Sequence, residues 1–390
     1  MLSRLRAIFN RHKSSSAHNP ADQRFVFTII ILVAVGLVML TSASSIVAYK
    51  IYGDSYYFLT HQLVSVVLGA IAFWLFSKID YRHWRKIAFF LLLCSLALLS
   101  LVFVPGLGRE VNGSQSWINF FGFSLQPSEI VKLTFIIYLA ALFENKNDTP
   151  QRFKSFLLVY GVVALLMLLQ PDPGTLFILT AAAFGVYYIG GGKRRHIVML
   201  VSAGLLALLI LVIIPQGRYR LDRFRCLFDA SYSPQQACYQ VNQSLIAIGS
   251  GGLFGRGLGE SRQKFLYLPE VQNDFIFAVI AEEVGFVFSV ALIGLLAFLF
   301  YRMYIIAVTA PDTFSRNLTV GIALWLITQV ILNIGGIIRI LPLTGVPLPL
   351  ISYGGSAILS VLGGLGIVAG ISKQRGARQV MKPLKRSYEK

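Results

Sequence analysis

The chain has 390 residues, of which 56% are hydrophobic and only 13% are charged, and its mean hydropathy is +0.68. Such a composition excludes a soluble globular domain and predicts an integral membrane protein. The net charge is +18, but the cations are spread over short segments between apolar runs, which argues against a nucleic-acid partner.

Ten apolar runs predict an all-α membrane domain over residues 25–372, because several of them approach the ~20 residues that a spanning helix needs. The runs are residues 25–46, 57–77, 87–105, 128–144, 155–170, 174–190, 196–214, 274–301, 317–340 and 353–372. The flanking segments, 1–24 and 373–390, are basic tails, and we expect the first to be disordered.

The distribution of Lys and Arg predicts the orientation of the chain in the membrane. If the N-terminus is inside, the inner segments carry 24 of the 35 cations and the outer loops carry nine. Because Lys and Arg concentrate in cytoplasmic loops, we expect a multi-pass protein with both termini in the cytoplasm. The exception is a large outer loop between the seventh and eighth helices, residues 215–273, which holds seven cations.

Several polar stretches precede that loop. Residues 111–129 are expected to form an outer loop that dips into the membrane interface through its aromatic side chains. Glu129 and Lys132 have i,i+3 spacing on one face of the next helix, so they either contact a substrate or form a structural ion pair. In the QPDPGT turn, Asp172 can cap the following helix, and it is also a candidate substrate contact.

The large outer loop combines cations with glycines. Its cations are Arg218, Arg220, Arg223, Arg225, Arg256, Arg262 and Lys264. The glycine-dense stretch 246–264, which includes Gly251 and Gly252, would let backbone amides and cations close on a phosphate, whereas the alternative is a flexible loop with solvated charges. The loop also holds Cys226 and Cys238, for which we expect a disulfide in preference to two free thiols.

Asp274 opens the long apolar run of residues 274–301. It can be the N-cap of this helix, or a general base at the boundary between water and membrane. Glu270, just before it, is a candidate substrate contact. Glu282 and Glu283 lie two turns further, where carboxylates must be paired, protonated or hydrated, so we expect structural polar residues, with direct catalysis as the alternative.

The segment LPLTGVPLPLISYGGS, residues 341–356, is rich in proline and glycine and separates the last two helices. Non-helical backbone at membrane depth is tolerated mainly where it is buried or lines a cavity. The candidate substrate contacts in this segment are therefore Ser352, Gly354 and Gly355. Gln329 and Asn333, in the preceding run, are expected to be structural polar residues.

Taken together, these motifs resemble the SEDS family, the FtsW/RodA membrane proteins of bacterial cell-wall synthesis. The motifs that carry the resemblance, over about residues 25–371, are NGSQSWI with QPSEIVK, QPDPGT, YRLDRF, NQSLIAIGSGGLFGRGLGESRQKFLYLPE, NDFIFAVIAEE and TGVPLPLISYGGS. Within the family, GLGESRQKFLYLPE and AVIAEE look more like the FtsW division branch than the RodA elongation branch.

The resemblance implies a ten-helix peptidoglycan glycosyltransferase of the bacterial cytoplasmic membrane. Its substrate would be lipid II, a disaccharide-peptide on undecaprenyl pyrophosphate, polymerised on the outer face. A class B penicillin-binding protein and other division or elongation proteins would be its partners.

The resemblance also implies roles for single residues, since the family's essential aspartate falls on Asp274. Joining an acceptor hydroxyl to an anomeric carbon with inversion needs a base, and pyrophosphate leaves without being protonated, so one carboxylate suffices. We expect Arg220, Arg223 and Lys264 to contact the pyrophosphate. Mg²⁺ or Mn²⁺ would be able to share that role, and no organic cofactor is expected.

Three positions depart from the family pattern. Ser116 replaces an Arg before Trp117, Arg339 replaces a Gly, and Gln272 replaces a common His. Three alternative functions stay open: a lipid II flippase, a non-enzymatic scaffold and an elongation-type polymerase like RodA. A flippase would use the intramembrane charges Lys132, Glu282, Glu283 and Arg339.

Overall fold

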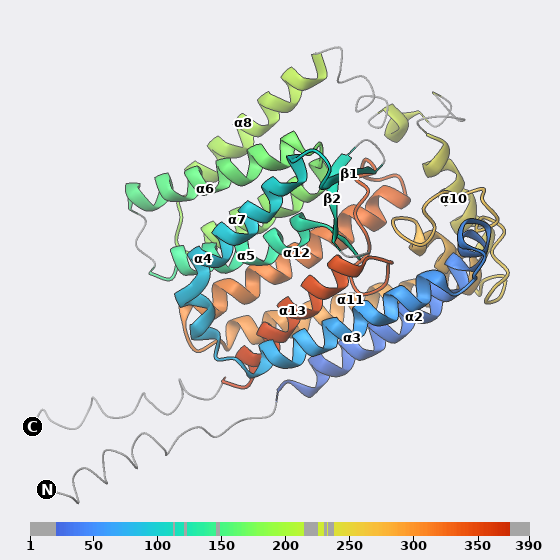
Figure 1. The fold of residues 1–390 in the computed structure, drawn as a ribbon, viewed down its shortest axis with the longest axis horizontal. Helices are drawn as coiled ribbons and strands as arrows, with labels where there is room; N and C mark the ends of the chain where they lie inside the picture. Colours follow the sequence, from blue (N-terminus) through green and yellow to red (C-terminus); the bar gives the residue numbers. More distant parts are fainter. Residues whose placement is uncertain are drawn as a thin grey trace, which may run out of the picture.

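The computed structural model describes residues 21–111, 114–120, 123–145, 149–213, 225–229, 232 and 238–374, which form a helical bundle with a small sheet beside it (Figure 1). Its helices are α2 Gln23–Tyr52, α3 Tyr57–Lys78, α4 Tyr81–Ser100, α5 Pro127–Leu142, α6 Pro150–Leu169, α7 Pro173–Ile189, α8 Arg194–Ile213, α10 Tyr239–Gly251, α11 Ile276–Val308, α12 Thr313–Ile337 and α13 Gly355–Ser372. Each of the ten predicted runs coincides with one helix, and α10 lies inside the predicted outer loop.

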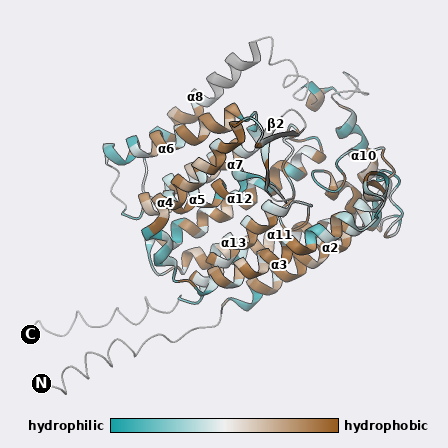
Figure 2. Ribbon diagram, viewed as in Figure 1, coloured by the Kyte–Doolittle hydropathy of each residue, from teal (hydrophilic) through white to brown (hydrophobic). Residues whose placement is uncertain are grey.

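The composition of the helices fits a membrane environment. Among the described helices, seven are long and apolar enough to span a bilayer, and α7 is a shorter apolar helix. Figure 2 shows hydrophobic residues along the bundle and hydrophilic residues gathered towards the helix ends and loops. The predicted fold class, an all-α polytopic membrane protein, is confirmed, with the small sheet as an addition. Most of the two predicted tails lies outside the described residues.

The sheet replaces part of the loop predicted at residues 111–129. The 3₁₀ turn Leu101–Phe103 leads into the antiparallel strands β1 Gly108–Val111, β2 Ser114–Phe120 and β3 Phe123–Leu125, in the order β1-β2-β3. Ile118 in the middle strand is buried and pairs with both neighbours. We expected an aromatic loop because the short strands are interrupted by turn residues, which hides their alternation.

The helices α12 and α13 form the centre of the bundle. Most of their side chains, including Trp325 and Leu365, are enclosed, whereas most of the surface of α3 and α6 faces outward. A Cβ at Gly366 would lie 2.5 Å from the carbonyl oxygen of Phe73, so α13 and α3 pack at the distance that only a glycine permits. Such small-residue contacts are a main source of helix association in lipid, where apolar burial drives little.

Helix α11 is interrupted at Gly285, whose φ is 79° and ψ is −176°. The segment after α10 fills the break. The amides of Arg256 and Gly257 donate to the carbonyls of Glu282 and Glu283 (3.0 and 2.9 Å). In return, the amides of Phe286 and Val287 donate to the carbonyls of Gly252 and Leu253 (2.9 and 3.1 Å). The backbone groups that the helix loses are therefore satisfied by this segment, and such satisfaction is what a bilayer would require of a broken helix. We call residues 251–264 the helix-break loop.

Opposite the helix-break loop, the starts and ends of three helices meet. Asp22, the N-cap of α2, accepts a salt bridge from Arg302 of α11, and its amide donates to Ser372 Oγ of α13 at 3.0 Å. The start of α2 and the end of α13 therefore lie on the same side of the bundle, which we call the Asp22 end. The other side carries the helix-break loop and the segment that leads into α11, and we call it the Asp274 end.

Replacing Gly285 with alanine should disrupt this arrangement. A Cβ there would lie 2.2 Å from the amide nitrogen of Gly255, at a φ that L-residues rarely adopt, so we expect Gly285→Ala to cost several kcal/mol. Gly294 of the same helix has nothing within 4 Å of its Cβ position and serves as the control. Thermal unfolding in detergent should give a much lower midpoint for Gly285→Ala than for Gly294→Ala, and equal midpoints would contradict the described break.

Candidate functional site

Asp274 lies in the turn that leads into α11. Phe275 occupies the N-cap position of that helix, so the expected N-cap role of Asp274 is wrong, because the helix starts later than its apolar run. The Asp274 side chain is half-buried, and one of its carboxylate oxygens lies 3.5 Å from the Cβ position of Gly345. Glu270 shapes the turn before it, with a φ of 54° and a hydrogen bond from Asn273 Nδ2 at 2.7 Å.

The backbone around Asp274 is fixed by the segment 341–354 and by α12. Asn333 Nδ2 donates to the carbonyls of both Asp274 and Val346, each at 2.8 Å. Ser352 Oγ donates to the carbonyl of Asn273 at 2.6 Å, and the amide of Tyr353 donates to that of Gln272 at 2.9 Å. Residues 59 and 79 positions away in sequence therefore hold the backbone around Asp274, and Asn333 has the contacts of a structural polar residue.

The same polar chain continues into the bundle. Gln329 Nε2 donates to the carbonyl of Pro347 at 2.8 Å, and its Oε1 accepts from Lys132 at 3.4 Å and from Trp325 at 2.9 Å. Lys132 also pairs with Glu129 at 2.6 Å, and their side chains are only 1% and 2% exposed. Because both charges are enclosed and paired, their contacts are those of the structural ion pair that we gave as the alternative, and substrate contacts at Glu129 and Lys132 stay a prediction.

Four of the candidate substrate contacts border this region. Asp172 caps α7 by accepting from the amide of Thr175 at 3.0 Å, which is the capping role we predicted. Gly354 is fixed by Gln62, whose Oε1 accepts from the Gly354 amide at 3.1 Å. Gly355 is the first residue of α13. The side chain of Ser352 is buried between the Leu348 amide and Asn273, so its contacts position the backbone.

A second polar cluster lies where α11 is broken. Glu282 accepts hydrogen bonds from Ser261 Oγ at 2.6 Å and from the Arg262 amide at 3.0 Å. Glu283 accepts from Ser42 Oγ of α2 at 2.7 Å and forms an ion pair with Lys264 at 3.0 Å. Both glutamates therefore have the contacts of structural polar residues. A serine within an apolar run carries no sequence signal, so the contact of Ser42 could not be predicted.

Lys264, for which we expected a pyrophosphate contact, is held by partners within the chain, and the pyrophosphate contact stays a prediction. The Lys264 side chain is 4% exposed, and its ammonium also donates to the Gly259 carbonyl at 2.6 Å. The glycines of this loop have packing roles as well. A Cβ at Gly251 would lie 2.0 Å from the carbonyl oxygen of Ala281, and Gly252 has a φ of 57°. These glycines allow the helix-break loop to pack against α11. The sequence did not predict this role, because it does not show that the helix is broken.

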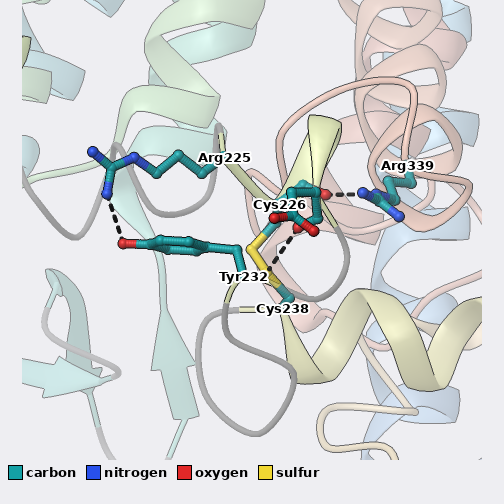
Figure 3. Close-up of a disulfide and its surroundings, with 6 residues drawn as sticks. Arg225, Cys226, Tyr232, Cys238 and Arg339 are labelled. Carbon is teal, nitrogen blue, oxygen red and sulfur yellow. Dashed lines mark hydrogen bonds between the residues drawn. A yellow bond between two sulfur atoms is a disulfide. The ribbon is translucent and has the colours of Figure 1, made fainter.

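Earlier in the predicted outer loop, Cys226 and Cys238 form a disulfide, with Cα atoms 5.4 Å apart. Figure 3 shows that Arg339 Nε reaches the carbonyl of Cys226, while Arg225 donates to Tyr232 Oη. Arg339 follows the end of α12, so our expectation that it lies within a helix is wrong. Arg220 and Arg223 lie outside the described residues.

The family resemblance also raises a divalent cation, Mg²⁺ or Mn²⁺, as a candidate ligand. Among the described residues, no group of three His, Cys, Asp or Glu side chains could hold a metal ion.

Removing one charge of the Glu129–Lys132 pair should cost more stability than removing both. Lys132→Met leaves a buried carboxylate without its counter-charge, which typically costs about 3–5 kcal/mol. In the double variant with Glu129→Gln neither charge remains, so we expect most of that loss to be recovered. Thermal unfolding in detergent tests this, and a double variant no more stable than Lys132→Met would argue against the structural pair.

The disulfide makes a second prediction that mass spectrometry can check. Cys94 is a free cysteine, and the chain has three cysteines in all. Alkylation of the denatured protein should therefore add one group without reductant and three groups after reduction. Three additions in the absence of reductant would show that Cys226 and Cys238 are thiols.

Comparison with known proteins finds relatives that match the whole membrane domain. The sequence profile of the FtsW/RodA/SpoVE cell cycle proteins matches residues 22–377. A probable peptidoglycan glycosyltransferase FtsW of Trichlorobacter lovleyi is 37% identical over 355 residues, covering 90% of this chain and 93% of the relative. The stage V sporulation protein E of Bacillus subtilis is also 37% identical over 356 residues, covering 90% of this chain and 97% of the relative.

Solved structures agree with these relatives. A chain of a peptidoglycan synthase complex, described as coordinating polymerization and crosslinking, superposes with a TM-score of 0.74 at 30% identity, covering 92% of this chain and 99% of that one. The rod shape determining protein RodA of Thermus thermophilus superposes with a TM-score of 0.68 at 31% identity, covering 91% and 98%. The chain therefore belongs to the FtsW/RodA/SpoVE family of membrane proteins.

Proposed function

We propose that this protein is a peptidoglycan glycosyltransferase that polymerises lipid II at the Asp274 end of the bundle. The observation that carries the proposal is the contrast between its carboxylates. Asp274 is a half-buried carboxylate on a backbone fixed from two sides. The side chains of Glu129, Glu282 and Glu283 are instead almost fully buried, at 2%, 1% and 1% exposed. A general base must reach its substrate's proton, which favours Asp274.

In the proposed reaction, Asp274 takes the proton of an acceptor sugar hydroxyl as that oxygen attacks the anomeric carbon of the donor. The bond from this carbon to the pyrophosphate breaks, and the configuration inverts. Because pyrophosphate leaves as a stable anion, no second carboxylate has to protonate it, in contrast to glycoside hydrolysis. The remaining need is to offset the charge that develops on the pyrophosphate, which suits the cations of the outer loop.

The contacts of the intramembrane charges weigh against the flippase. A transport path would present its charges to a moving head group. Lys132 and Glu283 are instead held in ion pairs, and Arg339 contacts the backbone of Cys226 beyond the end of α12. These contacts fit a fixed bundle with chemistry at one end better than a polar path through its centre.

The proposed setting follows from the orientation and from the relatives. The Lys and Arg distribution supports cytoplasmic termini, with the Asp274 end on the outer face of the cytoplasmic membrane. The relative named FtsW favours a role in division, and a RodA-like role in elongation is the alternative. The synthase complex supports a class B penicillin-binding protein as crosslinking partner, alongside other division or elongation proteins.

We also propose that a divalent cation, Mg²⁺ or Mn²⁺, assists by binding the substrate's pyrophosphate. When bound, it would offset negative charge on the leaving group. Since the described residues supply no three-ligand cluster, chelation with EDTA should slow the reaction without lowering the unfolding temperature of the protein.

Glycan synthesis from labelled lipid II tests the proposed base. Asp274→Asn keeps the size of the side chain but removes the base, so we expect polymerisation to fall by at least 10²-fold, the lower end of general-base catalysis. Asp54→Asn is the matched control, because Asp54 is an exposed carboxylate between α2 and α3 that should leave activity unchanged. Full polymerisation by a folded Asp274→Asn protein would reject the assignment.

A further inference from the structure

The ends of α3 and α13 bring two lysines together at the Asp22 end of the bundle. Lys78 is the last residue of α3, and Lys373 follows the last residue of α13. The two helices pack closely side by side (Figure 1), and a Cβ at Gly370 would lie 3.2 Å from the carbonyl oxygen of Ser77. The backbones of the two helix ends are therefore close to each other, and their terminal lysines are neighbours.

Contacts with α3 hold both ammonium groups in place. Lys373 Nζ donates to the carbonyl of Ser77 at 3.0 Å and to its hydroxyl at 3.4 Å. Lys78 Nζ lies 3.6 Å from the centre of the Trp74 ring, which is a cation–π contact. Burial, and then the ammonium of Lys78, lower the pKa of Lys373, because a second positive charge close by disfavours the protonated form. The helix ends therefore hold two like charges close together.

Within the part of the chain that the structure describes, neither lysine forms a salt bridge. The carboxylate nearest to Lys78 in sequence, Asp80, accepts from the Arg82 amide at 2.9 Å and lies 3.7 Å from the Arg82 guanidinium. A lysine at a helix end can serve only to satisfy its last carbonyls, and Lys373 does donate to α3. That role explains one lysine, but two converging cations without a carboxylate also attract an anion from outside the chain.

An exposed apolar surface leads along α3 to this pair of lysines. Ile71, Trp74 and Leu75 are exposed, and with Lys78 they have the i, i+3, i+4, i+7 spacing of one helix face. Tryptophan is enriched where the hydrocarbon core meets the lipid head groups, so Trp74 suits that boundary. A phospholipid would place its acyl chains on this face and its phosphate at the lysines, whereas a soluble phosphate would use the lysines alone.

We propose that Lys78 and Lys373 bind the phosphate of an anionic phospholipid, whose acyl chains lie along the exposed face of α3. The site is at the opposite end of the bundle from Asp274, and it does not depend on the proposed function. One phosphate shared by the two lysines links the end of α3 to the end of α13. Because a ligand that binds the folded state stabilises it, the phospholipid should raise the unfolding temperature of the bundle.

Titration of the full chain with phosphatidylglycerol in detergent, followed by native mass spectrometry and thermal unfolding, tests the site. The double variant Lys78→Gln with Lys373→Gln should bind phosphatidylglycerol about 30-fold more weakly, because each lysine near an anionic lipid contributes about fivefold. Phosphatidylglycerol should raise the unfolding midpoint of the wild type but not that of this variant. Lys86→Gln with Lys154→Gln is the matched control, since it removes two exposed charges from the first two turns of α4 and α6 and should bind like the wild type.

Four results would overturn the proposal. Equal phosphatidylglycerol binding by the wild type and the Lys78/Lys373 variant would remove the site. A midpoint that this variant lowers by the same amount with and without phosphatidylglycerol would show that the lysines only stabilise the helix ends. If neutral phosphatidylcholine raises the wild-type midpoint as much as phosphatidylglycerol does, the charge of the lipid plays no part. If soluble glycerol phosphate does so, the lysines take a free phosphate and not a phospholipid.

Discussion

The exchange of backbone hydrogen bonds at the break in α11 is the constraint on which the rest of the structure depends. Gly285 releases two carbonyls and two amides, and the helix-break loop satisfies all four. A helix interrupted in a bilayer would otherwise leave polar groups without partners, at several kcal/mol each. The exchange also fixes where Glu282 and Glu283 lie, so the glutamates can anchor the segment that returns towards Asp274.

Asp274 is consequently held from two directions. The helix-break loop, anchored by Glu282, sets the start of the chain segment that precedes it, while Asn333 and Ser352 fix its backbone from the other side. Polar residues deeper in the bundle also support this backbone through a chain of hydrogen bonds. Lys132 donates to Gln329, and Gln329 donates to the carbonyl of Pro347. A base that is positioned before substrate arrives avoids the cost of reorganisation during the reaction.

Much of the fold follows from hydropathy, because a membrane demands long apolar runs and each of the ten runs coincides with a helix. The segments that meet at Asp274 were also visible as motifs. The partners of the buried charges were not visible in the sequence. Lys264 contacts Glu283 only because the loop folds back into the break in α11, and a single glycine at position 285 does not predict such a break. The role of Ser42 and the short strands were hidden for the same reason, because their contacts are tertiary.

The most direct test of the central claim restores a carboxylate at position 274 by chemistry. In a Cys94→Ala background, Asp274→Cys leaves one free thiol, since Cys226 and Cys238 are bonded to each other. Iodoacetate converts that thiol to a carboxylate, and iodoacetamide converts it to a neutral amide of nearly the same shape. If Asp274 is the general base, lipid II polymerisation should return only after iodoacetate. Equal activity after both reagents would contradict a general base at this position.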